Sequence, residues 1–424
     1  MTDRVSIIGA GVAGLSCAVR LAQAGRKVTV FEASPYAGGR CRSFHDQGLD
    51  AIIDNGAHLM LSGNTDILAY LDLIGARDQV LASERARFEF LDVEFDQAWA
   101  IDLAAGQGIG SVIKWIFDAT RRPPNVGPWT LMRDVFALKM SQGKTVAACL
   151  DTRRPHFRTF WEPLCVGVMN APPEEAAAEL LWAVFEETVL LGGFFARPML
   201  TRNGLGAALV DPALNTLAQA NVDVKLAQRV RSLDFKKGRV SGLVLAKGAE
   251  VLGEHDQVVL AVPHMAVAGL IHDMTAPQAS HAIINVHYRL KSPQKSALKG
   301  AVGSPVQWVF TRDHIASVTM SAADGWVDKD ADEIARALWP DVVKVLGLET
   351  TAMPAYRVIK ERRATFAQSP DAIAQRPGTQ TKYENLYLAG DWTNTGLPAT
   401  LEGAIRSGRK AAEAVLGNGK LDRE

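Results

Sequence analysis

Three glycines and one glutamate near the start of the chain have the clearest spacing for chemistry. Gly9, Gly11 and Gly14 form a G-x-G-x-x-G motif, and Glu32 follows about 20 residues later. Glycines in this pattern allow a tight turn and let the backbone approach a pyrophosphate, because no side chain fills that space. A carboxylate at this distance can accept hydrogen bonds from a ribose diol. The four residues therefore predict a dinucleotide-binding site.

The elements that must position these residues lie on both sides of the motif. Val5–Ile8 is a short apolar run typical of a buried parallel strand. Leu15–Ala24 has helical spacing, and Lys27–Phe31 reads as a second strand. Gly14 then lets the helix pack close to the first strand, with the helix N-terminus facing the phosphates. The cofactor contacts predicted in this region are Gly9, Gly11, Ala13, Gly14, Glu32 and Ala33.

A loop with the sequence Gly-Gly-Arg follows the second strand. Gly38 and Gly39 mark the loop, and Arg40 comes directly after them. Glu32 followed closely by this sequence resembles the flavoprotein amine oxidase and phytoene desaturase superfamily. The resemblance implies that the loop, including Gly39, covers an FAD cofactor and that Arg40 contacts the FAD phosphates. Arg40 taken alone is equally compatible with a solvated surface charge.

A histidine in a motif-like setting lies in the segment Ile52–Met60. The resemblance implies that this segment, including Gly56, passes near the flavin ring. His58 is the candidate catalytic residue, because an imidazole titrates near neutrality and can give a proton to a departing group. The alternative is a histidine that only packs against the cofactor or forms a hydrogen bond to it.

The C-terminal block has a second set of cofactor residues. Asn385–Trp392 reads as a strand that contains Gly390 and Asp391, and a helix opens after Pro398. The resemblance implies that Asp391 holds the ribityl chain, and that the helix N-terminus faces the N1–C2 edge of the flavin. It also implies that the backbone at Val230 meets the adenine. The remaining predicted contacts at the helix are Thr400, Leu401 and Ala404.

Composition limits the classes of partner. The 424 residues include 46 basic and 46 acidic side chains, so a general attraction to nucleic acid is not indicated. No apolar run reaches the roughly 18 residues needed to span a bilayer. The four cysteines are far apart and include no C-x-x-C pair, which favours reduced thiols in the cytoplasm. The histidines are scattered, so no metal site is predicted.

The rest of the chain predicts a second unit between the nucleotide-binding segments. Residues 61–200 read as a mainly helical insertion, and Arg202–Gly206 as a turn before a helix at Leu205–Ala218. Val222–Val262 reads as a meander of short strands, and strands are expected at Val286–Leu290 and Val306–Phe310. The prediction is an α/β protein with a Rossmann-like FAD-binding domain from residues 1–60, 201–264 and 371–424. An α+β substrate-binding domain would comprise residues 61–200 and 265–370.

The motifs together resemble the hydroxysqualene dehydroxylase family, also called squalene-associated FAD-dependent desaturases. The stretch Asn55–Asn64, which reads NGAHLMLSGN, and the short overall length point to this branch. The family implies an enzyme that uses reduced FAD to replace the hydroxyl of hydroxysqualene with hydrogen, supplying squalene for hopanoids. With only one dinucleotide motif, an outside electron donor, whose identity the sequence does not give, is expected to reduce the flavin.

Two other classes stay open at the level of sequence. A carotenoid desaturase or an amine oxidase would run the flavin in the opposite direction. A prenyl-binding protein without catalysis is the non-enzyme alternative. Flavin content separates this last class from the other two, because a carrier without flavin would not be yellow.

The segment from residue 105 to 144 predicts a peripheral contact with the cytoplasmic membrane. It has six basic residues against Asp118 and Asp134, and the apolar residues Trp115, Ile116, Phe117 and Trp129 lie among them. Tryptophan prefers the membrane interface, and basic residues attract anionic lipid. A hydrocarbon substrate held in the bilayer would need an entrance facing lipid. The alternative is that these aromatic residues belong to the core.

Overall fold

The glycine motif directly follows the central strand of a five-stranded parallel sheet in the computed structural model, which describes residues 4–417. The strands come from the beginning, middle and end of the chain, in the spatial order β10-β2-β1-β14-β18. Their bounds are β1 Arg4–Ile8, β2 Lys27–Phe31, β10 Asp223–Lys225, β14 Gln257–Leu260 and β18 Leu386–Leu388. The predicted α/β, Rossmann-like architecture is confirmed.

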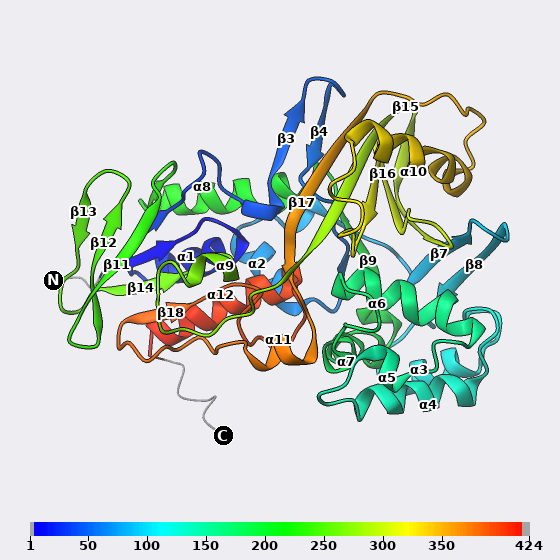
Figure 1. Cartoon of the computed structure of the whole chain (residues 1–424), viewed down its shortest axis with the longest axis horizontal. Coiled ribbons are helices and arrows are strands. Elements are labelled where there is room, and N and C mark those ends of the chain that lie inside the picture. Colours follow the sequence, from blue (N-terminus) through cyan, green and yellow to red (C-terminus); the bar gives the residue numbers. More distant parts are fainter. Residues whose placement is uncertain (1–3, 418–424) are drawn as a thin grey trace.

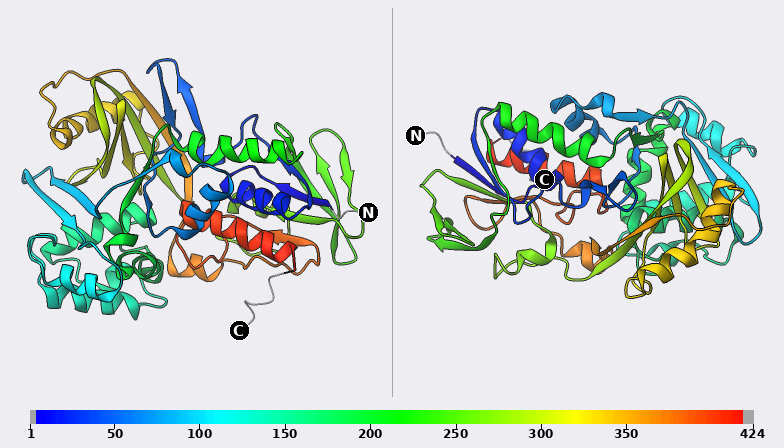
Figure 2. Two further views of the ribbon diagram at one scale, coloured as in Figure 1. Left: turned by 180° about the vertical axis from the view of Figure 1, so that it is seen from behind. Right: turned by 90° about the horizontal axis from the view of Figure 1, so that it is seen from above.

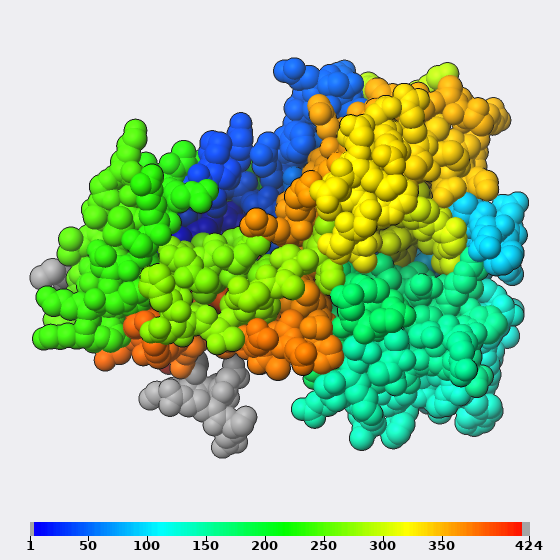
Figure 3. Space-filling view, viewed as in Figure 1, coloured from blue at the N-terminus to red at the C-terminus, as the bar shows by residue number. Residues whose placement is uncertain are grey.

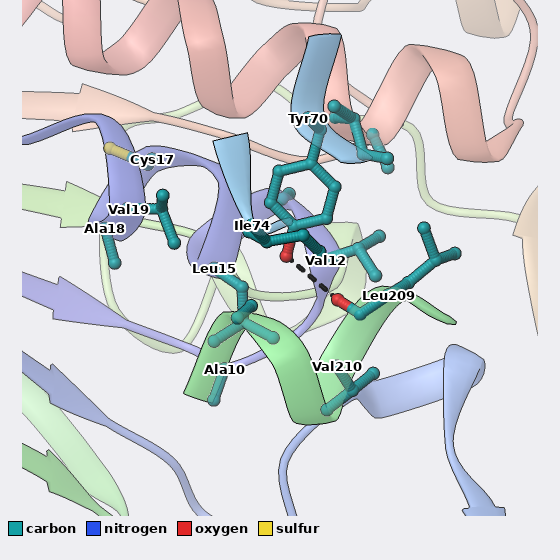
Figure 4. Packing of buried hydrophobic residues seen from close by; sticks show 14 of the residues in the cluster. Ala10, Val12, Leu15, Cys17, Ala18, Val19, Tyr70, Ile74, Leu209 and Val210 are labelled. Carbon is teal, nitrogen blue, oxygen red and sulfur yellow. Dashed lines mark hydrogen bonds between the residues drawn. The ribbon is translucent and has the colours of Figure 1, made fainter. Parts of the chain in front are cut away.

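Four helices cover one face of this sheet (Figures 1 and 2). They are α1 Val12–Gln23, α2 Thr65–Leu73, α8 Asp211–Gln219 and α12 Leu401–Val415. Helices α1 and α12 come so close that a Cβ atom on Gly408 would lie 2.2 Å from the carbonyl oxygen of Ala13. The buried Tyr70 hydroxyl donates to the carbonyl of Leu209, at 2.9 Å (Figure 4). These contacts join the two ends of the chain into one core.

A small antiparallel sheet and a short helix lie against the other face of the parallel sheet. The elements are β11 Val230–Lys236, β12 Arg239–Leu245, β13 Ala249–Val251 and α9 His264–Val267. The meander predicted for Val222–Val262 is therefore right only for β11–β13, because β10 and β14 join the parallel sheet instead. The helix predicted from Leu205 begins as a π-helical turn at Gly206–Val210 and continues as α8.

A second large sheet forms the other half of the molecule (Figure 1). Its strands are β7 Arg87–Asp92, β8 Gln97–Asp102, β15 Ser280–Val302, β16 Trp308–Met320 and β17 Tyr356–Phe366. Helix α10, Ala331–Leu346, packs on one face against Ile284, Val286 and Tyr288. The strand predicted at Val286–Leu290 lies inside β15, whereas the one predicted from Val306 begins at Trp308.

The remaining elements connect the two halves or form a helical layer below the second sheet. The strands are β3 Ser43–Asp46, β4 Ala51–Asp54, β5 Met60–Leu61, β6 Val80–Ala82 and β9 Pro198–Thr201. The helices are α3 Ile109–Phe117, α4 Pro128–Lys139, α5 Val146–Cys149, α6 Glu162–Met169, α7 Ala178–Glu187 and α11 Pro370–Ala374. The expectation of a mainly helical segment is thus wrong for residues 80–102, which form β6, β7 and β8.

One of the aromatic residues on which the predicted membrane contact rests belongs to the core. Trp115 is only 2% exposed, and its indole nitrogen donates to the carbonyl of Arg121, at 3.1 Å. It packs in the helical layer with Phe160, so its expected role at a membrane surface is wrong. Among the helices of residues 4–417, none is long and apolar enough to cross a bilayer.

Candidate cofactor and active site

The glycine motif has space on one side and tight packing on the other. Gly9 has a φ of +113°, and a Cβ atom there would lie 2.3 Å from the carbonyl oxygen of Ala261. A Cβ atom on Gly14 would lie 2.0 Å from the carbonyl oxygen of Gly9. A Cβ atom on Gly11 would meet no atom of the described residues within 4 Å. The positive φ of Gly9 fits the predicted tight turn, the short distance at Gly14 fits the predicted close packing of helix on strand, and the open space at Gly11 fits a pyrophosphate.

Glu32 is fixed next to the motif by backbone donors. Its two carboxylate oxygens accept from the amides of Ala10 and Ser34, each at 2.8 Å. The amide of Gln228 donates to the backbone carbonyl of Glu32 at 2.7 Å, which holds the segment before Val230 beside Glu32. Glu32, its neighbour Ala33 and the Val230 backbone therefore lie in one region, as a site for the adenosine half of a dinucleotide requires.

Arg40 and Asp391, predicted separately, are paired with each other. An Arg40 Nη atom lies 2.8 Å from a carboxylate oxygen of Asp391, whose side chain is 8% exposed. Burial alone would raise the pKa of Asp391, but the charge and hydrogen bond of Arg40 hold it below its usual range. Arg40 is therefore not a free surface charge. The pair joins the Gly-Gly-Arg loop to the end of β18.

The loop between Asp391 and α12 is organised by Arg376, which sequence analysis missed. Arg376 is 7% exposed, and its guanidinium donates to the carbonyls of Asp391, Trp392, Thr393 and Leu397. No sequence motif indicates that Arg376 organises this loop, because the residue lies in an irregular segment after α11. The contacts fix the path of the chain from Gly390 to the start of α12.

Thr400 caps the start of α12. The Thr400 hydroxyl accepts from the amide of Gly403 at 3.1 Å, and Leu401 and Ala404 are buried in the helix contact with α1. The amide of Gly390 donates to the Ser407 hydroxyl at 2.7 Å. The turn after β18 and the N-terminus of α12 thus lie together, with the positive end of the helix available to an electron-rich ring edge.

Gln368 ties this turn to the helical layer. Its side-chain nitrogen donates to the carbonyl of Met169 at 2.5 Å, and its side-chain oxygen accepts from the amide of Ala399 at 2.7 Å. Gln368 is fully buried, so both bonds are protected from water. The residue was not identified from the sequence, since its partners are far away along the chain.

His58 is half-buried beside Gly56. Its Nδ1 lies 2.8 Å from the carbonyl oxygen of Gly56, so Nδ1–H donates and Nε2 is left without a proton in the neutral ring. Burial lowers the pKa of His58, although the hydrogen bond to Gly56 opposes this.

A second histidine, His264, is buried and bonded to the Ser280 hydroxyl at 2.9 Å. Burial also lowers the pKa of His264, with the charge of Asp391 opposing it.

The space-filling view shows where a bound dinucleotide has room. In Figure 3 the dark blue N-terminal segment is set back between the green surface of β11–β13 and the orange strand β17. Hydrogen bonds bring the segments of the predicted site together: the amide of Ala10 donates to Glu32, the amide of Gly38 donates to the carbonyl of Ala10, and Arg40 pairs with Asp391. These donors, acceptors and free volume fit a dinucleotide such as FAD.

Comparison with known proteins gives consistent results over the whole chain. The flavin containing amine oxidoreductase family matches residues 12–416. Hydroxysqualene dehydroxylase of Rhodopseudomonas palustris is 40% identical over 99% of this chain and 100% of its own length. The protein of the same name from Sinorhizobium fredii is 38% identical over 98% and 99%. Among solved structures, cyclohexylamine oxidase of Brevibacterium oxydans superposes with a TM-score of 0.72 at 16% identity, covering 99% of each chain.

Proposed function

We propose that this chain, which belongs to the hydroxysqualene dehydroxylase family of the flavin-containing amine oxidoreductases, converts hydroxysqualene to squalene. It is an FAD-dependent enzyme. The observation that carries the proposal is full-length identity of 36–40% to relatives with this one activity in their names. A flavin-free prenyl carrier is disfavoured by the same comparison. We further propose that the squalene supplies hopanoid synthesis.

The residues of the chain have distinct proposed roles. The Gly11 backbone and the N-terminus of α1 bind the pyrophosphate, and Glu32 binds the adenosine ribose. The pair of Arg40 with Asp391 binds the central part of FAD, and the N-terminus of α12 faces the ring. Bound FAD, once reduced by an external donor, supplies the hydride that replaces the hydroxyl. The protein must supply a proton and exclude water from the carbocation.

The division into two domains is also a proposal. The predicted FAD-binding domain of residues 1–60, 201–264 and 371–424 contains the whole parallel sheet. Helix α2 lies beyond residue 60, yet Ile67, Tyr70 and Leu71 pack in the core of that sheet with α1 and α12. We therefore extend the first segment of this domain through α2. The second sheet and the helical layer form the proposed substrate-binding domain.

The reaction can be tested with reduced enzyme and substrate in the absence of oxygen. Photoreduced holoenzyme mixed with hydroxysqualene is expected to regain the oxidised flavin spectrum and to release squalene in equal amount, because one hydride is used per hydroxyl replaced. Absorbance and product analysis by gas chromatography measure the two changes. Flavin reduction by squalene or a carotenoid, without reoxidation by hydroxysqualene, would instead identify a desaturase.

We propose that the protein docks on a membrane through an apolar surface on α3 and α4. Its residues, called the docking surface below, are Ile109, Ile113, Phe117, Trp129, Met132, Phe136 and Met140. They follow helical spacing on each helix, and Trp129 is 71% exposed. The rings of Phe117 and Trp129 meet edge to face at 5.9 Å, which joins the two helices into one surface. A surface this apolar marks an interaction site.

Charge around the docking surface favours an anionic leaflet as its partner. Lys114, Arg133, Lys139 and Lys144 are exposed near it. The two acids of the segment are paired, since Asp118 pairs with Arg121 and buried Asp134 with Arg133 and His156, so Lys114, Lys139 and Lys144 provide positive charge that no acid among the described residues pairs. Each basic residue near an anionic surface contributes about 1 kcal/mol, and each buried large apolar side chain about 1.5–3 kcal/mol. Docking would place the helical layer against the bilayer that holds the substrate.

Replacing three exposed residues of the docking surface tests this partner. The variant Trp129→Ser/Phe136→Ser/Met140→Ser is expected to keep its FAD and to co-sediment at least tenfold less with anionic liposomes. The matched control is Phe95→Ser/Val251→Ser, which removes two exposed apolar side chains elsewhere and should bind like the native protein. Binding of the native protein should also weaken with salt. Equal liposome binding of all three proteins, or dissociation of a dimer in the triple variant, would contradict membrane docking.

A further inference from the structure

The second sheet presents a polar face to the segment that contains His58. Side chains alternate along a strand, so Ile284 and Val286 of β15 pack toward α10 while Asn285 and His287 point to the opposite face. Asn285 pairs across the strands with Thr319 of β16, which places their side chains side by side. Polar residues buried on a sheet face need partners, because each unpaired donor costs free energy.

The side-chain amide of Asn285 forms only one of the hydrogen bonds that it could form. Its side-chain oxygen accepts from the Thr319 hydroxyl at 2.9 Å, and the residue is only 2% exposed. Within residues 4–417, no hydrogen bond uses its side-chain nitrogen Nδ2 as donor. Thr319 therefore fixes the amide with its oxygen toward the sheet and its NH2 group away from it. Among the described residues, Nδ2 is not one of the fully enclosed side-chain atoms without a partner, so it keeps some accessible surface from which it can donate to a ligand.

The unused NH2 group points at the candidate active site. Nδ2 lies 3.0 Å from the position that a Cβ atom on Gly56 would occupy, and His58 Cε1 lies 3.6 Å from the same point. The nearby carbonyl of Gly56 already accepts from His58 Nδ1. The amide thus lies against the turn that contains His58, and a ligand that reaches the accessible side of Nδ2 beside this turn can accept from it.

We propose that Asn285 Nδ2 binds the hydroxyl oxygen of the substrate. This assignment rests on the proposed function, in which the substrate is a hydrocarbon with one polar atom. Asn285 is neutral and keeps its protons. When the C–O bond breaks, the oxygen takes the bonding pair, receives a proton from a separate acid and leaves as water. The hydrogen bond from Nδ2 strengthens as charge develops on that oxygen, which lowers the barrier to departure.

The assignment makes Asn285 a determinant of specificity for the hydroxylated substrate over the product. Squalene has no acceptor, so its binding leaves the amide unpaired. A site built to bind a hydroxyl discriminates against the analogue that lacks it for this reason. Asn285→Ala removes the donor, so squalene binding no longer leaves an amide unpaired. The ratio of the dissociation constant for squalene to that for hydroxysqualene therefore measures the contribution of the hydrogen bond from Asn285.

Titration of oxidised holoenzyme with each lipid measures that ratio. Changes in the flavin spectrum report binding of hydroxysqualene and squalene from the same detergent micelles. Native enzyme is expected to favour hydroxysqualene at least tenfold, and Asn285→Ala to reduce this preference at least fivefold, with its FAD content unchanged. Thr319→Val, which frees the amide to rotate, should give a smaller reduction. Ser317→Ala is the matched control, since Ser317 lies on the same strand but bonds His287.

The outcomes separate this assignment from the proposed function. If native enzyme converts hydroxysqualene and Asn285→Ala keeps the full preference, the assignment alone is overturned. The assignment would also be overturned if Asn285→Ala bound both lipids equally less tightly, lost its FAD, or shifted the flavin potential without lipid. In those cases Asn285 would support the fold or contact the ring. A native enzyme that neither converts hydroxysqualene nor prefers it over squalene would overturn both.

Discussion

Gly11→Val is expected to give a folded protein that binds no FAD. Position 11 tolerates a side chain in the protein itself, because its φ of −72° suits any residue and a Cβ atom there meets no described atom within 4 Å. The same side chain would fill the space in which the pyrophosphate approaches the backbone. Absorbance near 450 nm after purification should vanish, and added FAD should no longer raise the melting temperature.

The neighbouring glycine supplies the control. Gly14→Val places its Cβ atom 2.0 Å from the carbonyl oxygen of Gly9 in a tightly packed helix–strand contact, so this variant should fail to fold. Gly11→Val should instead keep the circular dichroism of the native apoprotein and unfold within about 1 kcal/mol of it. Stoichiometric FAD in purified Gly11→Val would contradict the proposed path of the pyrophosphate.

Elements with strong local signals were predicted well from the sequence. The apolar run at Val5–Ile8 and the strand Lys27–Phe31 match β1 and β2, because buried parallel strands read as continuous apolar runs. The C-terminal helix was also predicted, and its apolar side is buried against α1. In each case the residues within one element decide both its type and its buried side.

Elements that depend on distant partners were predicted less well. Strands β6–β8 were missed, since β7 is stabilised by parallel pairing with β15, more than two hundred residues away. Trp115 was assigned to the surface because aromatic and basic residues were counted over the whole segment. Helical spacing divides the apolar residues of α3 between two sides. Val112 and Trp115 lie on the buried side, and Ile109, Ile113 and Phe117 lie on the exposed side.

The residues of the site that were missed share one property. Arg376, Gln368 and Asn285 act through hydrogen bonds to residues outside their own elements, and each lies in a segment without a motif. The glycine motif and Glu32 could be identified because the cofactor requires several backbone features within one short stretch. A buried amide or guanidinium has no such local pattern. Its partners become visible only when the two halves of the molecule are in place.

His58 is the residue we propose as the proton donor, and the structure gives its pH dependence. Burial lowers the pKa of His58 below its ordinary value of about 6.5, so the ring is mostly neutral at pH 7. Proton donation needs the imidazolium, whose population grows as the pH falls toward the lowered pKa. Single-turnover reoxidation of the reduced flavin by hydroxysqualene should therefore become faster from pH 8 to pH 6.

His58→Ala is expected to slow this step by about 100-fold or more, the usual contribution of a general acid, and to remove its pH dependence. The FAD content should not change, because the expected FAD contacts of this turn come from the Gly56 backbone. His58→Gln separates acid catalysis from packing, since glutamine fills similar space and forms hydrogen bonds but cannot donate a proton at neutral pH. If His58 is the acid, the glutamine variant should be as slow as the alanine variant. Recovery of the native rate by glutamine would show that the ring only packs or forms hydrogen bonds, and would assign the proton to another group.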